Sequence, residues 1–409
     1  MKILVQKFGG TSVRDKESRQ SAISHIENAI NDGYKVVVVV SAMGRHPDPY
    51  ATDSLLELVG YPNTSISKRE QDLLLSCGET ISSVVFSNEL KKNHVSSIAL
   101  TGAQAGFLTN DNFTDAKIKG MNVGRVHEEL MEHDVVVVAG FQGKTEGGEI
   151  TTIGRGGSDT SAAALGAALN AEFIDIFTDV EGIMTADPRV VKSARTLDVV
   201  TYTEICNLAY QGAKVVHPRA VEIAMQVKVP MRVRSTKSKD TGTLVTNSRE
   251  QTKGKDIPDR LVTGIAHMSE ITQIKVQSTN EPYQLHSKVF KAMAEAGISV
   301  DFINISPNGV VYTIPEVFTD KAVPLLQELG LKPEITNNCA KVSLVGAGMT
   351  GVPGVTAKIV QTLTDAEVQI LQSADSHTTI WVLIREKDLV AAVNALHQTF
   401  GLDLVKTSL

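Results

Sequence analysis

Short apolar runs alternate with amphipathic stretches over residues 1–245, and this alternation most constrains the fold. Runs such as Val36–Val40 and Val135–Ala139 are bounded by polar residues or glycine, which is typical of strands buried on both faces. The pattern predicts an α/β domain with a mostly parallel sheet between two helix layers. The other expected strands are Ile3–Val5, Ser97–Leu100, Phe173–Phe177 and Pro230–Val233. The expected helices are Arg19–Asn31, Ile81–Lys92, Val123–Glu132, Thr160–Leu169 and Ala213–Gln226.

A different organisation follows a polar, unpatterned segment, 246–259, which we interpret as a linker. The sequence from Val289 (VFKAMAEAGISVDFINIS) aligns with that from Ile359 (IVQTLTDAEVQILQSADS). Each copy predicts a helix and a strand, with one further strand before it and one after it. This repeat predicts two ferredoxin-like α+β modules, 260–338 and 339–409. The last strand could instead complete the first module. The flanking strands are expected at Ile274–Val276, Val310–Ile314, Val342–Val345 and Thr379–Ile384.

Composition narrows the class of protein. The net charge of -6 gives no basis for a nucleic-acid or anionic-membrane partner, and no apolar run approaches the ~20 residues that span a bilayer. The three cysteines, at 77, 206 and 339, have neither a disulfide framework nor metal-ligand spacing. The first strand leads directly into a glycine-rich motif, which leaves no room for a secretory signal. We therefore expect a cytoplasmic protein.

Two glycine-containing segments have the chemistry of anion sites. KFGGTS, Lys7–Ser12, follows the first strand, so Gly9 and Gly10 can present backbone N–H groups to a phosphate beside the Lys7 charge. GRGGSD, Gly154–Asp159, precedes a helix, whose N-terminus favours an anion, and Arg155 can grip a carboxylate or phosphate. A plain strand-to-helix turn and a capped loop are the structural alternatives.

Two further segments are less specific by themselves. TDVEGIMTADPR, Thr178–Arg189, is a turn-rich loop at the carboxyl end of a strand. In SCGE, Ser76–Glu79, the glutamate is expected to open the helix near Ile81, where it would ordinarily stabilise the helix N-terminus. Gly346–Gly351 has the pattern G-x-G-x-x-G, but the chain after it is too short for a dinucleotide-binding fold.

Together these motifs resemble the aspartokinases of the amino-acid kinase superfamily. KFGGTS, SAMG (Ser41–Gly44), GRGGSD, TDVEGIMTADPR and GAKVVHP (Gly212–Pro218) have the order and spacing of that family, and the repeated modules look like paired ACT domains. The resemblance implies an amino-acid kinase fold. It also implies phosphorylation of the L-aspartate side chain by ATP with Mg²⁺, giving 4-phospho-L-aspartate, the first step towards diaminopimelate, lysine, threonine and methionine.

The resemblance also implies feedback inhibition by an end-product amino acid. Ferredoxin-like modules expose sheet edges that favour pairing between chains, so we expect a homodimer through these modules. The sequence looks closest to the diaminopimelate-sensitive class of the bacilli, which favours meso-diaminopimelate over lysine or threonine as the inhibitor. Two rivals stay open: another enzyme of this fold, acting on glutamate derivatives, carbamate or a nucleotide, and a non-catalytic amino-acid sensor. SCGE, TDSLL and the paired modules disfavour the first rival. Lys7, Arg155 and Asp159 disfavour the second.

Residue roles follow from the resemblance at matching positions. Lys7 and Asp159 would be catalytic, and no protein residue would bind metal. Met184 departs from the family, because an aromatic residue often stands there. Extra residues before Thr52 loosen its match, and His217-Pro218 is expected to be a structural corner. The implied ATP-binding residues are Lys7, Phe8, Gly9, Gly10, Ser41, Thr178, Asp179, Met184, Arg189, Lys214 and Val215. The implied aspartate-binding residues are Thr52, Glu79, Arg155, Gly156, Gly157 and Ser158. The implied effector-binding residues are Glu281, Gln284, His286, Ser376 and His377.

Overall fold

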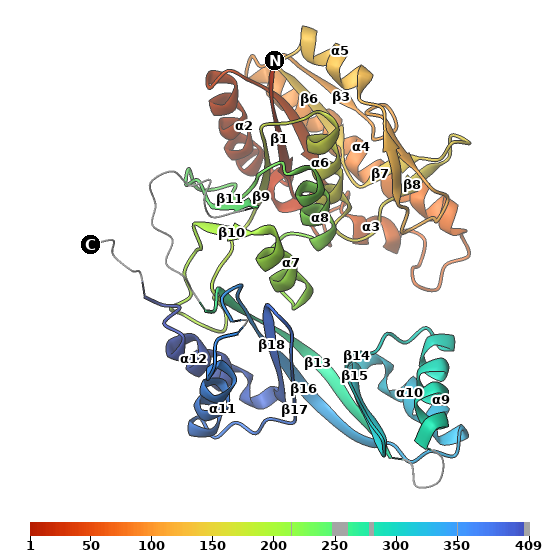
Figure 1. Ribbon diagram of the computed structural model, residues 1–409. Coiled ribbons are helices and arrows are strands. Elements are labelled where there is room, and N and C mark those ends of the chain that lie inside the picture. The colour runs from red at the N-terminus through yellow and green to blue at the C-terminus, as the bar shows by residue number, and fades with distance from the viewer. Residues whose placement is uncertain (214, 248–260, 278–281, 350, 405–409) are drawn as a thin grey trace. The chain divides into compact units, whose positions relative to one another are not determined.

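The computed structural model describes residues 1–213, 215–247, 261–277, 282–349 and 351–404 (Figure 1). Contacts divide them into two compact units. Unit 1 comprises Met1–Ile183, Thr196–Ala209 and the described part of Lys214–Ile257. Unit 2 comprises Met184–Arg195, Tyr210–Ala213 and the described part of Pro258–Leu409. Within the described residues, no helix is long and apolar enough to cross a membrane. Almost all of the predicted linker 246–259 lies outside them.

An eight-stranded sheet forms the centre of unit 1, in the order β10-β12-β11-β9-β1-β2-β6-β3. Every neighbouring pair is parallel except β11 with β12. The mostly parallel sheet predicted from the sequence is therefore confirmed, with all six expected strands in it. Its strands are β1 (Lys2–Phe8), β2 (Tyr34–Val40), β3 (Ser97–Leu100), β6 (Val135–Ala139), β9 (Phe173–Thr178), β10 (Val199–Thr201), β11 (Met231–Ser235) and β12 (Thr243–Thr246).

Helices cover both faces of this sheet, which explains the unbroken valine run in β2. Val36, Val38 and Val40 pack in one core with α2 (Lys16–Asn31) and α4 (Lys68–Lys92), while the alternate valines are equally buried on the other face. Helix α6 (Gly157–Ala168) contacts β1, β2 and β9 and packs against α8 (Pro218–Val227) (Figure 1). The remaining helices of unit 1 are α1 (Gly10–Val13), α3 (Thr52–Glu57), α5 (Gly124–Glu132) and α7 (Tyr202–Tyr210).

A small second sheet in unit 1 has the order β5-β4-β7-β8. Strand β7 begins at Gln142, just after the turn that ends β6, and β8 leads into the glycine-rich segment Gly154–Asp159. In the chain, the second sheet therefore lies between the end of β6 and the glycine-rich segment that precedes α6. Its strands are β4 (Phe107–Thr109), β5 (Ile118–Met121), β7 (Gln142–Lys144) and β8 (Ile150–Thr152).

Two predicted helix starts are wrong. Helix α4 begins at Lys68 rather than near Ile81, because Ser67 and Glu70 form a reciprocal capping box there. Helix α8 begins at Pro218 rather than Ala213, with proline in the first turn, where its missing N–H costs no hydrogen bond.

Unit 2 contains a six-stranded sheet in the order β14-β15-β13-β16-β18-β17. Two strand–helix–strand–strand repeats build it, β13-α9-β14-β15 and β16-α11-β17-β18, as the internal repeat predicted. Each repeat has its own core, with α9 and α10 over one and α11 and α12 over the other (Figure 1). The strands are β13 (Gly264–Gln277), β14 (Asp301–Ser306), β15 (Gly309–Pro315), β16 (Glu334–Val345), β17 (Gln372–Asp375) and β18 (Thr379–Arg385). The helices are α9 (Pro282–Glu295), α10 (Thr319–Glu328), α11 (Val355–Asp365) and α12 (Leu389–Thr399), with 3-10 turns at Glu316–Phe318 and Glu386–Asp388.

Segment Met184–Arg195 interrupts unit 1 and belongs structurally to unit 2. Ala186 and Val191 are buried in the core of the second repeat. The backbone oxygen of Thr185 accepts a hydrogen bond from the Ile265 N–H at 2.8 Å, and its hydroxyl lies 2.9 Å from Nε2 of buried His397. This exchange was not predicted, because the motif Thr178–Arg189 indicated a single loop.

Candidate active site

The carboxyl ends of four central strands lie in one row. Phe8 pairs with Val40 and with Phe177, and Val40 pairs with Ala139. In a parallel sheet, ligands bind outside such strand ends. Three of the loops that leave this row begin at Gly9, Ser41 and Gly140. The fourth follows Thr178, the last residue of β9. The register therefore brings together segments that are far apart in the sequence.

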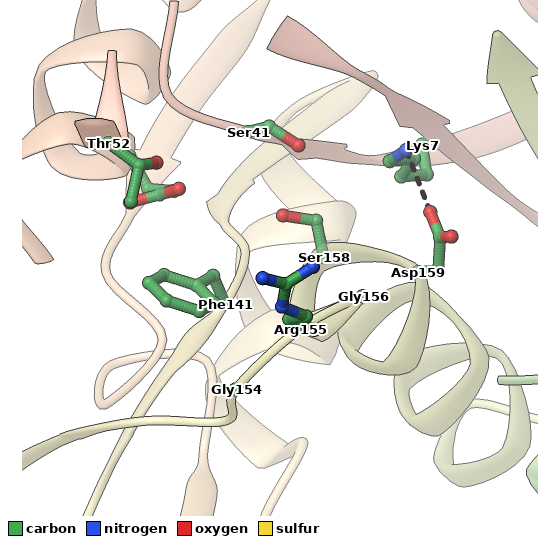
Figure 2. A pocket seen from close by; sticks show the side chains of 11 residues that line it. Lys7, Ser41, Thr52, Phe141, Gly154, Arg155, Gly156, Ser158 and Asp159 are labelled. Carbon is green, nitrogen blue, oxygen red and sulfur yellow. Dashed lines mark ion pairs between the residues drawn. The ribbon is translucent and has the colours of Figure 1, made fainter. Parts of the chain in front are cut away.

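Lys7 and Asp159 form an ion pair at this edge. Lys7 Nζ lies 2.7 Å from Asp159 Oδ1, and each side chain is only 13% exposed. Asp159 is in the first turn of α6, and its second oxygen accepts the His217 backbone N–H at 3.2 Å. Asp159 therefore fixes the lysine ammonium in a place partly shielded from water (Figure 2).

A cavity of about 300 Å³ opens beside this pair. Figure 2 shows Arg155, Ser158 and Phe141 arranged around it, opposite Thr52 and Ser41. This volume is at the small end for ligand pockets and suits a compact metabolite. The cations Lys7 and Arg155 line the same space as the buried Glu79 and the partly exposed Asp159, so groups of both charge signs face a ligand there. The lining residues are Lys7, Ser41, Thr52, Glu79, Phe141, Gly154, Arg155, Gly156, Gly157, Ser158 and Asp159.

Glu79 is the most unusual of the lining side chains. It is 3% exposed and lies in the interior of α4. Its Oε1 accepts the Ala42 N–H at 3.0 Å, while the buried Oε2 has no hydrogen-bond partner among the described residues. Burial raises the pKa of the Glu79 carboxyl to about 8. A buried carboxylate with a free oxygen provides a place for a ligand cation.

The expectation that Glu79 opens a helix and stabilises its N-terminus is thus wrong. Gly78 lies in the middle of the helix because there is no room for a side chain: a Cβ there would lie 2.9 Å from Ala42 Cβ and 3.1 Å from the Tyr50 backbone oxygen. The glycine allows α4 to approach the Ser41–Gly44 loop closely. The same approach brings Glu79 to the Ala42 N–H.

The segment Gly154–Asp159 turns sharply before α6. Gly154 and Gly156 have φ values of +77° and +67°, which favour glycine. A Cβ on Gly156 would lie 2.1 Å from the ring of His217. His217-Pro218 is therefore a structural corner, as predicted, and it packs directly against the glycine-rich loop.

The two N-terminal loops also support each other. The Ser41 N–H donates to the Phe8 oxygen at 3.2 Å, and the Gly44 N–H donates to the Gly10 oxygen at 3.0 Å. A Cβ on Gly10 would lie 2.6 Å from the Ala42 oxygen, so this position has no room for a side chain. The Phe8 side chain is fully buried and stacks on Phe177, which leaves only its backbone near the strand end.

The remaining predicted nucleotide residues that the structure describes do not line the cavity. Thr178 and Asp179 lie at the end of β9, and Val215 follows the undescribed Lys214. Met184 and Arg189 belong to unit 2, where the 87% exposed Arg189 pairs with Asp187 at 2.7 Å.

The predicted effector residues are divided between the two repeats of unit 2. Gln284 and His286 lie on α9, and His286 Nε2 is 3.1 Å from the Ser306 oxygen. Ser376 and His377 lie between β17 and β18, and the Ser376 N–H donates to the Thr379 oxygen at 2.8 Å. Glu281 lies outside the described residues.

Phe141 lines the cavity although no motif predicted it, and Gly154, the first residue of the GRGGSD motif, lines the cavity as well. Phe141 has a φ of +66°, and its N–H donates to Ser161 Oγ at 3.0 Å. The signal was available, because the residues after a buried parallel strand such as Val135–Ala139 lie at the binding edge.

Comparison with known proteins agrees with this geometry. The model of the amino acid kinase family matches residues 2–235, and that of the ACT domain matches residues 334–398. Aspartokinase 1 of Bacillus subtilis (strain 168) is 65% identical over 402 residues, which cover 98% of this chain and 100% of that protein. The aspartokinase of Geobacillus stearothermophilus is 41% identical over 410 residues, covering 98% of each chain.

Solved structures give the same result. Escherichia coli aspartokinase III in complex with aspartate and ADP matches with a TM-score of 0.75 at 28% identity, covering 97% of this chain and 99% of that chain. Fold and site define an amino acid kinase with an ACT region. Within that class the chain belongs to the aspartokinases, which phosphorylate aspartate with ATP. The resemblance stated from the motifs is confirmed, and both rivals are set aside.

Gly156→Ala should abolish activity or folding, because the new Cβ meets the His217 ring and the positive φ is strained. Gly148→Ala is the matched control, since Gly148 has a φ of +86° with nothing within 4 Å of its Cβ position. Strain alone costs about 1–3 kcal/mol, so the control should lose only a few degrees of Tm and keep its kcat. Equal losses in both variants would show that contact with His217 is unimportant.

Proposed function

We propose that the cavity binds L-aspartate and that Lys7 stabilises the phosphoryl group in transfer from ATP. The observation that carries this proposal is the buried, half-partnered carboxylate of Glu79 in the same cavity as Arg155 and Lys7. Aspartate has one ammonium, which complements the buried carboxylate, and two carboxylates, one of which complements Arg155. Glu79 would accept the α-ammonium, and Arg155 would bind a carboxylate beside Thr52, Ser158 and the backbone of Gly156 and Gly157.

The chemistry needs no catalytic base. The side-chain carboxylate of aspartate, with an ordinary pKa of about 3.9, is already an anion at neutral pH. Its oxygen attacks the γ-phosphorus, the bond to the β-γ bridging oxygen breaks, and the products are 4-phospho-L-aspartate and ADP. The obstacle is the repulsion between two anions, so catalysis rests on positioned positive charge. Lys7 supplies it, Asp159 orients Lys7, and the N–H groups of Gly9 and Gly10 can contact phosphate.

Mg²⁺ would accompany the nucleotide. Among the described residues, no group of three or more His, Cys, Asp or Glu side chains is arranged to hold a metal ion. Mg²⁺ commonly keeps several waters and binds through substrate phosphates, so we expect the phosphates of ATP to hold it. When bound, it would neutralise part of their charge. Thr178, Asp179, Met184, Arg189, Lys214, Val215 and Ser41 remain the proposed nucleotide contacts.

The proposed organisation places catalysis in 1–245 and regulation in 260–338 and 339–409. The start of β16 at Glu334 and of the ACT match at residue 334 favour a slightly earlier boundary between the two modules. We also propose that the enzyme is cytoplasmic, supported by three cysteines that are all free. Its product would enter the synthesis of diaminopimelate, lysine, threonine and methionine.

Glu79→Gln tests the ligand assignment. The amide keeps the shape but cannot pair with an ammonium, so the KM for aspartate should rise at least about tenfold. In the wild type, the carboxyl carries a proton below its pKa of about 8. Aspartate must displace that proton, so its KM should fall by up to about tenfold per pH unit from pH 6 to 8. The glutamine variant should lack this slope, and a pH-independent wild-type KM would contradict the assignment.

Lys7→Ala tests the catalytic assignment. Loss of a preorganised charge at the transferring group should lower kcat about 10²–10³-fold, with a smaller change in the aspartate KM. Lys35→Ala is the control, because Lys35 also pairs with an aspartate, Asp134 at 2.9 Å, at the opposite end of the sheet. A Lys7→Ala enzyme with wild-type kcat would remove Lys7 from the mechanism.

We further propose a homodimer through unit 2. Strand β14 is at the sheet edge, where Ile303 and Ile305 are 48% and 56% exposed, and an edge strand of this kind favours pairing with another chain. Light scattering should give twice the chain mass of 43.9 kDa. Ile303→Lys with Ile305→Lys should shift it towards the monomer, whereas Val317→Lys, at an 80% exposed site on another element, should not. A monomeric wild type would refute the proposal.

Meso-diaminopimelate is the proposed feedback inhibitor, in preference to lysine or threonine. The support is the resemblance of Asp48–Leu56 and Leu371–Leu383 to the diaminopimelate-sensitive class. E. coli aspartokinase III has been solved with lysine and aspartate, which makes lysine the main rival. In an ADP-coupled assay, meso-diaminopimelate should inhibit at a lower concentration than lysine. A lysine inhibition constant at or below that of diaminopimelate would refute this proposal alone.

A further inference from the structure

Asp72 is a fully buried carboxylate outside the cavity. It precedes Glu79 by seven residues on α4, two helical turns, so both carboxylates project from one face. Asp72 has no ion-pair partner among the described residues and instead accepts three donors. The Thr152 N–H lies 2.8 Å from Oδ2, the Thr152 hydroxyl lies 2.6 Å from Oδ1, and the Thr114 N–H lies 3.0 Å from Oδ2.

Thr114 is itself a strained residue. Its φ is +72°, a region that β-branched residues rarely adopt unless the surroundings impose it. Gly154 packs on the turn that Thr114 forms, because a Cβ on Gly154 would lie 2.7 Å from Asp115 Oδ1. The hydrogen bond from Thr114 to Asp72 therefore holds the turn that supports the start of the glycine-rich loop.

Arg219 holds the same two segments through their carbonyl groups. Its guanidinium donates to the Ile153 oxygen at 3.0 Å and to the Ala116 oxygen at 3.3 Å. The Ala116 N–H also donates to the Thr152 oxygen at 2.9 Å. Asp72 of α4 thus binds N–H groups, and Arg219 of α8 binds carbonyl groups, in the two segments next to Gly154.

We propose that Asp72 and Arg219 are positioning residues, which hold loop 154–159 at the distance from Glu79 that aspartate binding needs. Asp72 and Glu79 both lie on helix α4. The same helix therefore holds the loop, through Asp72, and carries the ammonium-binding carboxylate of Glu79. Arg219 holds the loop from a second helix, α8, whose N-cap residue His217 contacts Gly156 and Asp159. The inference rests on the proposed role of this loop in binding aspartate.

Thr152 gives the sharpest test, because its variants change one hydrogen bond. Thr152→Val removes the hydroxyl that donates a hydrogen bond to Asp72 and keeps the side-chain shape. Because the loop is then held less firmly, the aspartate KM should rise about tenfold. The KM for ATP should stay within about twofold. Thr152→Ser keeps the hydroxyl and should restore the aspartate KM. Equal KM values for the valine and serine variants would overturn the inference.

Asp72→Asn and Arg219→Lys extend the test, since the amide turns one acceptor into a donor and lysine lacks the fork that reaches two carbonyls. Both should raise the aspartate KM more than the ATP KM. Glu204→Gln is the matched control. Glu204 is a buried carboxylate that accepts the N–H and hydroxyl of Thr201, both at 2.8 Å, and lines no part of the cavity. An equal rise of the aspartate KM in this control would mean that Asp72 only stabilises the fold and does not position the loop.

Arg155→Lys separates failure of this inference from failure of the proposed function. If Arg155 binds aspartate, its variant raises the aspartate KM, and adding Thr152→Val should then cost less than the two single effects combined. Fully additive effects would overturn the positioning role. An unchanged aspartate KM in Arg155→Lys would instead show that the loop does not bind aspartate.

Discussion

The hydrogen-bond register of the parallel strands is the constraint on which the active site depends. The register aligns the last residues of four parallel strands, Phe8, Val40, Ala139 and Phe177. The loops that follow these strands therefore all begin at the same end of the sheet. A shift of any strand by one residue would turn its side chains to the opposite face. Lys7 would then point away from Asp159, which lies on α6. The buried valines that fix the register therefore also fix the distance within the ion pair.

The motifs and the strands were predictable from the sequence, because both are local. A buried strand is a short apolar run, and a phosphate-binding loop is a glycine pair beside a lysine, as in Lys7–Gly10. Glu79 was interpreted wrongly, because a helix was expected to begin near Ile81, whereas α4 begins at Lys68 and Gly78 is a point of close approach within it. Only the fold shows that the Ala42 backbone lies against that glycine.

Buried polar groups with distant partners were equally invisible. Asp72 is an ordinary acidic residue in sequence, and its donors, Thr114 and Thr152, lie 42 and 80 positions away. No periodicity connects them, because the contact exists only once the small sheet packs on α4. Met184–Arg195 was misplaced for a related reason: its motif describes a loop, while Ala186 and Val191 are the apolar side chains that place it in another core.

The two ends of that segment and its middle are held by different parts of the structure. The Leu197 N–H donates to the Ile183 oxygen at 2.8 Å, so the two ends of the excursion are held together in unit 1. Its middle is held in unit 2 by Thr185 and by the buried side chains of Ala186 and Val191. The apolar residues of the excursion therefore belong to the core of the second repeat, while the hydrogen bond between its ends belongs to unit 1.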